Sequence, residues 1–257
     1  MADGRNRLNR IGAATLIAML PMTLGTAPSW SAATCSAQSA ADAAPVIELY
    51  TSEGCSSCPP ADRWLSRLKD DPSVVALAFH VDYWDRLGWK DRFASPAYTQ
   101  RQAQQLPSNG ARFSYTPQVV IDGFDRPRWH ATDPPGTTRA RAAALVDVQL
   151  TREGKQVAAT VQARPGAPAR LAGYWALTEN GHSTAVKAGE NEGATLQHDF
   201  VVQRYLPIAA WNATAGLPVA LRFEAEPALG AAPPRSVNLV VTDAATGKPV
   251  QAVRLGC

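Results

Sequence analysis

Two cysteines, Cys55 and Cys58, are separated by two serines and followed directly by two prolines. An apolar run of strand length, residues 46–51, precedes the pair, and residues 61–71 after it carry apolar side chains at helical spacing. A residue before proline is disfavoured in the helical conformation, whereas prolines are accepted in the first turn of a helix. The segment therefore predicts a strand, a cysteine pair and then a helix that begins at Pro59 with Cys58 as its cap.

The N-terminal segment has the pattern of a secretory signal peptide, because three arginines precede an apolar run and small residues lead to a cleavage site after Ala33. A membrane anchor is the alternative, but Pro21 and Gly25 interrupt the run, which is shorter than the roughly 20 residues of a spanning helix. Lipidation of Cys35 is disfavoured because threonine precedes it. We expect a periplasmic or secreted protein of a Gram-negative bacterium, with no membrane span after cleavage.

The charge of the chain gives no indication of nucleic-acid binding. The formal net charge is +3 at pH 7, and the first 33 residues hold three arginines and one aspartate, so the remaining chain carries about +1. Binding to phosphates requires a basic face. No Ser-His-Asp order, phosphate loop or paired-carboxylate motif supports a hydrolase or a kinase.

Disulfides persist in exported proteins, so the four cysteines are expected to pair. Cys55 and Cys58 are close enough in sequence to pair locally. That leaves Cys35 and Cys257 for a structural disulfide between the two ends of the mature chain. Two unpaired thiols are the alternative.

The chain after the first predicted helix continues with α/β elements. Ser95 followed by Pro96 marks a helix start, and we expect this helix to stop at Pro107. The dipeptide Asp-Gly gives a turn after a short apolar strand. The expected elements are a strand over 73–81, a loop or insertion over 82–94, a helix over 95–107, a strand over 118–121 and a closing helix over 137–146.

The sequence after about residue 146 changes to two-residue alternation, which is typical of antiparallel strands with one buried face. We expect an all-β, sandwich-like domain over 146–257. It follows an α/β domain over 34–145 that carries a helical insertion, and the signal peptide occupies 1–33. The expected strands of the second domain lie at 155–163, 170–178, 183–188, 195–206, 217–225 and 236–243.

The order strand, C-x-x-C, helix, strand, and then Thr-Pro before another strand is that of a thioredoxin-like domain with a mixed central sheet. We predict Cys55 as the catalytic nucleophile, because a helix start stabilises a thiolate, and Cys58 as the resolving thiol. Pro117 is expected in the cis form beside the cysteines, with Thr116 presenting its backbone to an extended substrate. An ordinary trans proline at a strand entry is the alternative.

The segment 80–84 lies at the end of a predicted strand, where open α/β sheets bind ligands. We predict that Trp84 walls a substrate groove beside the cysteines and that His80 and Asp82 support the site. Packing and hydrogen bonding are the alternative roles of these residues. Glu53 is a candidate acid near the pair, with a solvated loop charge as the alternative.

A metal site is a minor alternative, because C-x-x-C and His80 offer ligands for copper or zinc. All methionines fall in the signal segment, and a second C-x-x-C or a closely spaced histidine pair is missing. We therefore assign no metal and no other cofactor. His182 and His198 lie far along the chain from the cysteines and are interpreted as structural.

Four segments of the chain, residues 47–65, 74–102, 115–123 and 189–207, resemble a family of secreted bacterial proteins known as domain of unknown function 1223. The resemblance implies a thioredoxin-like domain followed by a β-sandwich, and no established reaction. Thioredoxins have a buried acid where this chain has Leu49, and the neighbouring Glu48 is expected to point to the opposite face of its strand.

The motifs together favour a periplasmic thiol–disulfide oxidoreductase. Its partners would be protein clients that carry thiols or disulfides, and a redox partner. The alternative is a non-catalytic envelope protein, with a binding or structural role, whose Cys55–Cys58 disulfide only fixes the start of the helix. Exposure distinguishes the two, because a redox centre needs an accessible sulfur.

Overall fold

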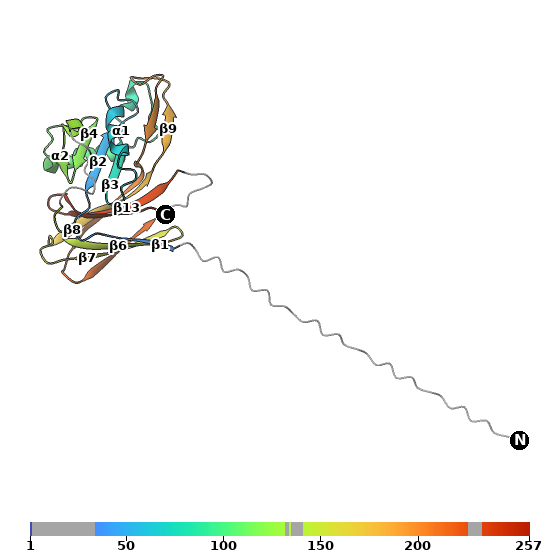
Figure 1. Cartoon of the computed structure of the whole chain (residues 1–257), viewed down its shortest axis with the longest axis vertical. Helices are drawn as coiled ribbons and strands as arrows, with labels where there is room; N and C mark the ends of the chain where they lie inside the picture. The colour runs from blue at the N-terminus through green and yellow to red at the C-terminus, as the bar shows by residue number, and fades with distance from the viewer. Residues whose placement is uncertain (2–33, 132–133, 135–140, 226–232) are drawn as a thin grey trace. The chain divides into compact units, whose positions relative to one another are not determined.

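An eight-stranded sheet joins strands from both halves of the chain (Figure 1). The computed structural model describes residues 1, 34–131, 134, 141–225 and 233–257. The strand order is β14-β13-β8-β11-β3-β2-β4-β5, in which β3 is parallel to both of its neighbours and all other neighbours are antiparallel. In chain order these strands are β2 (Val46–Thr51), β3 (Val75–His80), β4 (Gln118–Ile121), β5 (Phe124–Asp125), β8 (Arg170–Glu179), β11 (Val201–Asn212), β13 (Arg235–Asp243) and β14 (Pro249–Leu255).

A second, four-stranded antiparallel sheet has the order β1-β6-β7-β12. Its strands are β1 (Thr34–Gln38), β6 (Val146–Glu153), β7 (Gln156–Ala163) and β12 (Pro218–Glu224). Alternating side chains such as Val148 and Leu150 pack against Trp175 and Leu239 of the large sheet. Figure 1 shows β1, β6 and β7 as a layer against the end of the large sheet that holds β8 and β13. The two sheets therefore share one apolar core.

Two α-helices cover opposite faces of the strands that flank the cysteine pair. These helices are α1 (Pro59–Ser66) and α2 (Pro96–Asn109). Leu49 of β2 packs in a cluster with residues of α1, whereas Tyr50 packs in a cluster with α2. Both faces of β2 and β3 are therefore buried, which explains their continuous apolar runs. Short 3-10 turns, η1 (Asp85–Leu87) and η2 (Trp129–Ala131), and a small hairpin, β9 (His182–Ala185) with β10 (Thr195–His198), complete the described elements.

The local predictions around the cysteine pair are confirmed, because α1 begins at Pro59 with Cys58 at its cap. Ser95 caps α2 as expected, but the helix continues through Pro107 to Asn109, so the predicted end was wrong. A proline in the last turn removes a single backbone donor, and Gly110, at φ 88°, ends the helix in the left-handed conformation.

Two predictions for the later part of the chain need correction. The closing helix over 137–146 lies partly outside the described residues; residues 141–145 form no helix, and β6 begins at Val146. The single strand expected over 195–206 is divided into β10 and β11. The division falls at Phe200, which has a φ of 57°, a left-handed conformation that interrupts an extended strand.

The architecture is mixed α/β, with few helices and a large proportion of strands. Strands from beyond residue 145 extend the same sheet as β2–β5, and the described residues from 34 onward belong to one compact unit. The division into 34–145 and 146–257 stays a prediction, and the sheet continues across it. The predicted signal peptide falls on residues 2–33, outside the described residues. Within the described ranges, no helix has the length and apolar character needed to cross a membrane.

Candidate functional site

The structure joins Cys55 and Cys58 in a disulfide at the start of α1, with their Cα atoms 5.4 Å apart. The Cys58 amide donates to the Cys55 carbonyl at 3.2 Å, and the Cys58 carbonyl accepts from the amides of Ala61 and Asp62 in the first helical turn. The Ser57 hydroxyl lies 3.4 Å from the Cys55 sulfur. The pair is thus held by consecutive turns against a helix N-terminus, where the helix dipole favours a thiolate.

Both cysteines of this pair have 0% of their surface exposed. The loop between β9 and β10, residues 186–194, is bonded to the backbone around them. The Asn191 amide donates to the carbonyl oxygens of Glu53 at 2.8 Å and Cys55 at 3.0 Å. A Glu190 carboxylate oxygen accepts from the amide and the hydroxyl of Ser56 at 3.0 and 2.8 Å. In this oxidised form the disulfide is closed off from solvent.

Trp84 lies between the cysteine loop and the Thr116-Pro117 dipeptide. A Cβ built on Gly54 would be 3.2 Å from the Cβ of Trp84, and the indole N–H of Trp84 donates to the Thr116 hydroxyl at 2.7 Å. The Thr116-Pro117 peptide bond is cis, as expected from the sequence. Trp84, Thr116 and Pro117 are all partly exposed. The structure therefore connects the predicted substrate-binding residues to the cysteine loop through Trp84.

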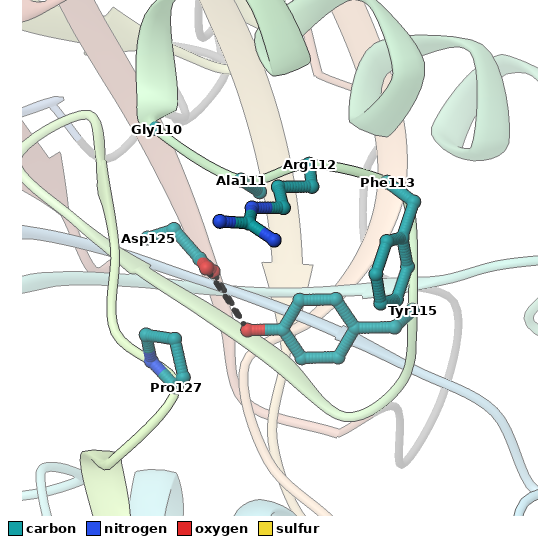
Figure 2. Close-up of a pocket in the computed structure, with 7 residues that line it drawn as sticks. All are labelled: Gly110, Ala111, Arg112, Phe113, Tyr115, Asp125 and Pro127. Atoms are coloured by element: carbon teal, nitrogen blue, oxygen red, sulfur yellow. Dashed lines mark hydrogen bonds between the residues drawn. The ribbon is translucent and has the colours of Figure 1, made fainter.

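A pocket of about 430 Å³ begins at Tyr115, the residue before Thr116. Figure 2 shows the Tyr115 hydroxyl directed at the Asp125 carboxylate, to which it donates at 2.8 Å. Burial and the Asp125 carboxylate raise the pKa of Tyr115 above its ordinary value, so the phenol stays protonated. Phe113 on the rim is 65% exposed. The pocket thus combines an exposed aromatic ring with polar groups that are fixed in place.

Glu53 is buried beside the cysteines rather than solvated. Its carboxylate accepts from the Trp89 indole at 2.8 Å and lies 3.4 Å from His198 Nε2. Its backbone amide donates to Asp91. Burial by itself would raise the pKa of Glu53, but His198 and Trp89 hold it below its ordinary value despite the opposing charge of Asp91. Glu53 is therefore a buried carboxylate anion two positions before Cys55.

His80 and Asp91 form a fully buried pair, with His80 Nδ1 and an Asp91 carboxylate oxygen 2.6 Å apart. The charge and hydrogen bond of His80 lower the pKa of Asp91 against the opposing effect of burial. The His80 ring lies 5.0 Å from that of His198, centroid to centroid. Asp82, in contrast, accepts from the Thr99 hydroxyl and fixes the first turn of α2. The structure thus places His80 in the buried cluster and Asp82 outside it.

His198 joins the same cluster, although it lies far along the chain from the cysteines. Its ring nitrogens face Glu53 at 3.4 Å and Asp62 at 3.8 Å. Asp62, in α1, accepts from the Thr51 hydroxyl at 3.1 Å. Burial would lower the pKa of His198, but the carboxylates of Asp62 and Glu53 raise it to about 9. We call Glu53, Asp62, His80, Asp91 and His198 the buried polar cluster.

Several members of this site were not predicted from the sequence, namely Asp62, Asp91, Glu190, Asn191 and the contact of His198. One usable signal was the stretch Gly-Glu-Asn-Glu-Gly at 189–193, where two glycines bracket polar side chains. Gly189 and Gly193 both have positive φ values, 79° and 81°. The turn they form presents Glu190 and Asn191 to the cysteine loop.

The other predicted disulfide is present between Cys35 and Cys257, with the Cα atoms 6.6 Å apart. It connects β1 to the chain end after β14. The predicted face of Glu48 is also confirmed, because its carboxylate bonds Arg101 on α2 while Leu49 packs on the side of α1. Neither feature contacts the buried polar cluster in the described contacts.

The fold and the site define a mixed α/β protein with a buried C-x-x-C disulfide at a helix start. The chain belongs to the family described as protein of unknown function DUF1223, whose model matches residues 46–241. No curated protein matches the chain.

Two solved structures are similar to this one. Protein AGR_C_4864 from Agrobacterium tumefaciens is 25% identical, with a TM-score of 0.60 over 83% of this chain and 94% of that one. HBP35 of Porphyromonas gingivalis is 14% identical, with a TM-score of 0.56 over 84% of this chain and 76% of that one. The second likeness concerns the fold alone.

Proposed function

We propose that this protein is an exported thiol–disulfide oxidoreductase in which Cys55 exchanges disulfides with clients and Cys58 resolves the mixed disulfide. The observation that carries the proposal is the position of the pair at the cap of α1, two residues after the buried carboxylate of Glu53. That carboxylate is held by Trp89 and faces His198. Ionisable groups with shifted pKa values beside a reactive residue are typical of functional sites.

The element order supports a thioredoxin-like fold for the part of the sheet that carries the site. Strand β2 leads through the cysteine pair into α1, β3 returns parallel to β2, and Thr116-Pro117 precedes the antiparallel β4. In this arrangement the Thr116 backbone would bind an extended client segment. Trp84 and the pocket at Tyr115 would form the walls of the client groove.

The exchange proceeds in two steps. The Cys55 thiolate of the reduced protein attacks a client disulfide, so a bond forms between Cys55 and the client while the other client sulfur leaves as a thiolate. The Cys58 thiolate then attacks the Cys55 sulfur, the Cys55–Cys58 disulfide forms, and the client leaves as a dithiol with both electrons. A partner dithiol restores the reduced protein by the reverse steps, and the reverse direction would oxidise a client dithiol.

The signal pattern at the N-terminus supports a periplasmic or secreted location, where clients with disulfides occur. The expected partners are such client proteins and a redox partner, not nucleic acid. Because both sulfurs are buried in the oxidised form, exchange requires the 186–194 loop to move away from the cysteine loop.

A second candidate is a non-catalytic envelope protein in which the disulfide only fixes the start of α1. The observation that favours it is the complete burial of Cys55 and Cys58, together with the bonds from Glu190 and Asn191. The two candidates differ in whether the disulfide can be reduced while the protein stays folded.

The test uses a Cys35→Ser/Cys257→Ser protein, in which Cys55 and Cys58 are the only thiols after removal of the leader. We expect the redox potential in glutathione buffers to be well above that of a structural disulfide, and alkylation across pH to give a Cys55 pKa below about 8.5. A Cys58→Ser variant should trap mixed disulfides with client proteins, whereas Cys55→Ser/Cys58→Ser should trap none. Resistance to glutathione together with an ordinary thiol pKa would establish the second candidate.

A further inference from the structure

We propose that Asp62, His80 and His198 form a binding site for a divalent transition metal of the zinc class. One ligand atom from each residue lies within 4.8 Å of the others, and all three residues are buried. In a tetrahedral zinc site, bonds of about 2.0–2.1 Å place ligand atoms roughly 3.3 Å apart. The three side chains are therefore close to ligating positions and would need to draw together by about 1–1.5 Å. This site goes beyond the proposed exchange reaction and does not depend on it.

The orientation of His80 is that of a metal ligand. Its Nδ1 is paired with the Asp91 carboxylate at 2.6 Å, and both side chains have 0% exposure. Its Nε2 is buried and has no hydrogen-bond partner among the described residues. Histidine ligands commonly bind metal through one nitrogen while a carboxylate holds the other. Asp91 thus fixes the His80 ring through Nδ1 and leaves the buried Nε2 unbonded.

His198 provides an independent observation of the same kind. It is 2% exposed, and neither ring nitrogen makes a hydrogen bond within the described part of the chain. Glu53 Oε1, 3.4 Å from His198 Nε2, is also buried and unbonded. Buried polar atoms are normally satisfied, and those that are not require an explanation. A metal bound by His198 would satisfy the ring nitrogen that faces Asp62.

The charge and chemistry of the cluster favour a dication with affinity for imidazole. Three carboxylates, those of Glu53, Asp62 and Asp91, surround two histidines in a buried space. A metal binds the neutral imidazole, so its binding would release the proton that His198 carries in the metal-free protein, and the dication would then balance most of the carboxylate charge. Two imidazoles and a carboxylate suit zinc and similar metals, whereas magnesium and calcium prefer all-oxygen sites. The Cys55–Cys58 disulfide offers no thiolate, so this site differs from a C-x-x-C metal clamp.

An entry route is also present. A cavity of about 150 Å³ between α1 and β10 is lined by Asp62 and His198, together with Pro59, Arg63 and Leu196 among others. It reaches two of the three ligands from the surface. A metal could therefore enter without unfolding of the sheet.

The test titrates Zn²⁺ into the metal-stripped, disulfide-intact protein by calorimetry, with Mg²⁺ as the comparison ion. We expect one equivalent of Zn²⁺ to bind, Mg²⁺ not to bind, and Co²⁺ to give a visible absorption band typical of nitrogen and oxygen ligands. His198→Gln should abolish the band, and Asp91→Asn should weaken Zn²⁺ binding by roughly 10- to 100-fold.

The matched controls are His130→Gln, an exposed histidine, and His182→Gln, whose ring is bonded to Glu179. Both should bind Zn²⁺ as the unaltered protein does. Circular dichroism of the metal-free variants checks that each is folded, and Asp62→Asn replaces His198→Gln if that variant is not. The proposal is overturned if the unaltered protein takes up no stoichiometric Zn²⁺, or if the ligand variants bind it as tightly as the controls.

Discussion

The side-chain amide of Asn191 donates a hydrogen bond to the carbonyl oxygen of Cys55 at 3.0 Å, although 136 positions separate the two residues. The same amide also reaches the carbonyl of Glu53 at 2.8 Å. A single side chain from the 186–194 loop therefore fixes the backbone on which the Cys55 sulfur is carried. A loop distant in sequence is thus bonded directly to the backbone of the cysteine loop.

Replacement of Asn191 by alanine should speed reduction of the Cys55–Cys58 disulfide by about 30-fold. Two hydrogen bonds of roughly 1 kcal/mol each are lost, so the 186–194 loop leaves the cysteine loop more often. The rate is measured with dithiothreitol by alkylation and mass spectrometry. Gln197→Ala is the control, because Gln197 is exposed on β10 and bonds only to Ser183 in the described contacts. Equal rates in the two variants would mean that the loop does not limit access.

Replacement of Thr116 by valine should lower the free energy of unfolding by about 1–2 kcal/mol, because the Trp84 indole N–H loses its acceptor in a partly buried position. Urea denaturation followed by tryptophan fluorescence measures the change. Thr160→Val on the exposed side of β7 is the matched control and should alter stability far less. If the oxidoreductase proposal holds, Thr116→Val also weakens client binding; a variant with unchanged stability would show that the contact is not formed in solution.

The parts of the site that the sequence predicted are those with short-range causes. Pro59 and Pro60 occupy the first turn of α1, where backbone amides lack partners, and Cys58 stands at the cap although its own backbone is helical, at φ −78° and ψ −37°. Thr116-Pro117 could be recognised from its place before an apolar strand. The pairing of Cys35 with Cys257 could be predicted because Cys55 and Cys58 are close enough in sequence to pair with each other.

The remainder of the site depends on contacts that no local pattern encodes. His198 reaches Glu53 and Asp62 because β10 lies beside α1, and the chain turns at Phe200 into β11, which pairs with β3. The Phe200 conformation is rare for a residue with a side chain, so periodicity predicted one uninterrupted strand instead. Strand alternation also says which face of a strand is buried, but not which sheet it joins.

Loss of the Cys35–Cys257 disulfide should lower the free energy of unfolding by about 2–5 kcal/mol, because the bond closes a very long loop and limits the unfolded chain. The measurement compares thermal or guanidinium unfolding of Cys35→Ser/Cys257→Ser with that of the unaltered protein, both without reductant. Cys55→Ser/Cys58→Ser provides the comparison for a short loop and should cost less. A double variant as stable as the unaltered protein would contradict this assignment of the stabilising bond.

A buried ion pair lies on the face of β2 opposite the buried polar cluster. The Glu48 carboxylate accepts hydrogen bonds from Arg101 and Gln105 of α2 and from the hydroxyl of Tyr174. The guanidinium of Arg101 also packs over the Tyr174 ring, 4.0 Å from its centroid. Burial would raise the pKa of Glu48, but Arg101 and these hydrogen bonds lower it below its ordinary value.

The lowered pKa of Glu48 predicts how stability depends on pH. The unfolded state binds a proton more readily, so the contribution of Glu48 to stability is fully present above its unfolded pKa of about 4.3. It is lost as pH falls through the lower pKa of the folded state.

Arg101→Leu should destabilise the protein at pH 7 by about 3–5 kcal/mol, because the Glu48 carboxylate stays buried without its partner. Burial then raises the pKa of Glu48, so part of this loss is recovered as pH falls through the raised value. Guanidinium unfolding between pH 3 and pH 8 measures the free energy of unfolding of the unaltered protein and of Arg101→Leu. Asp147→Asn removes an exposed ion pair and is the control, which should change the dependence on pH little. Parallel curves for Arg101→Leu and the unaltered protein would show that Glu48 is not the group responsible.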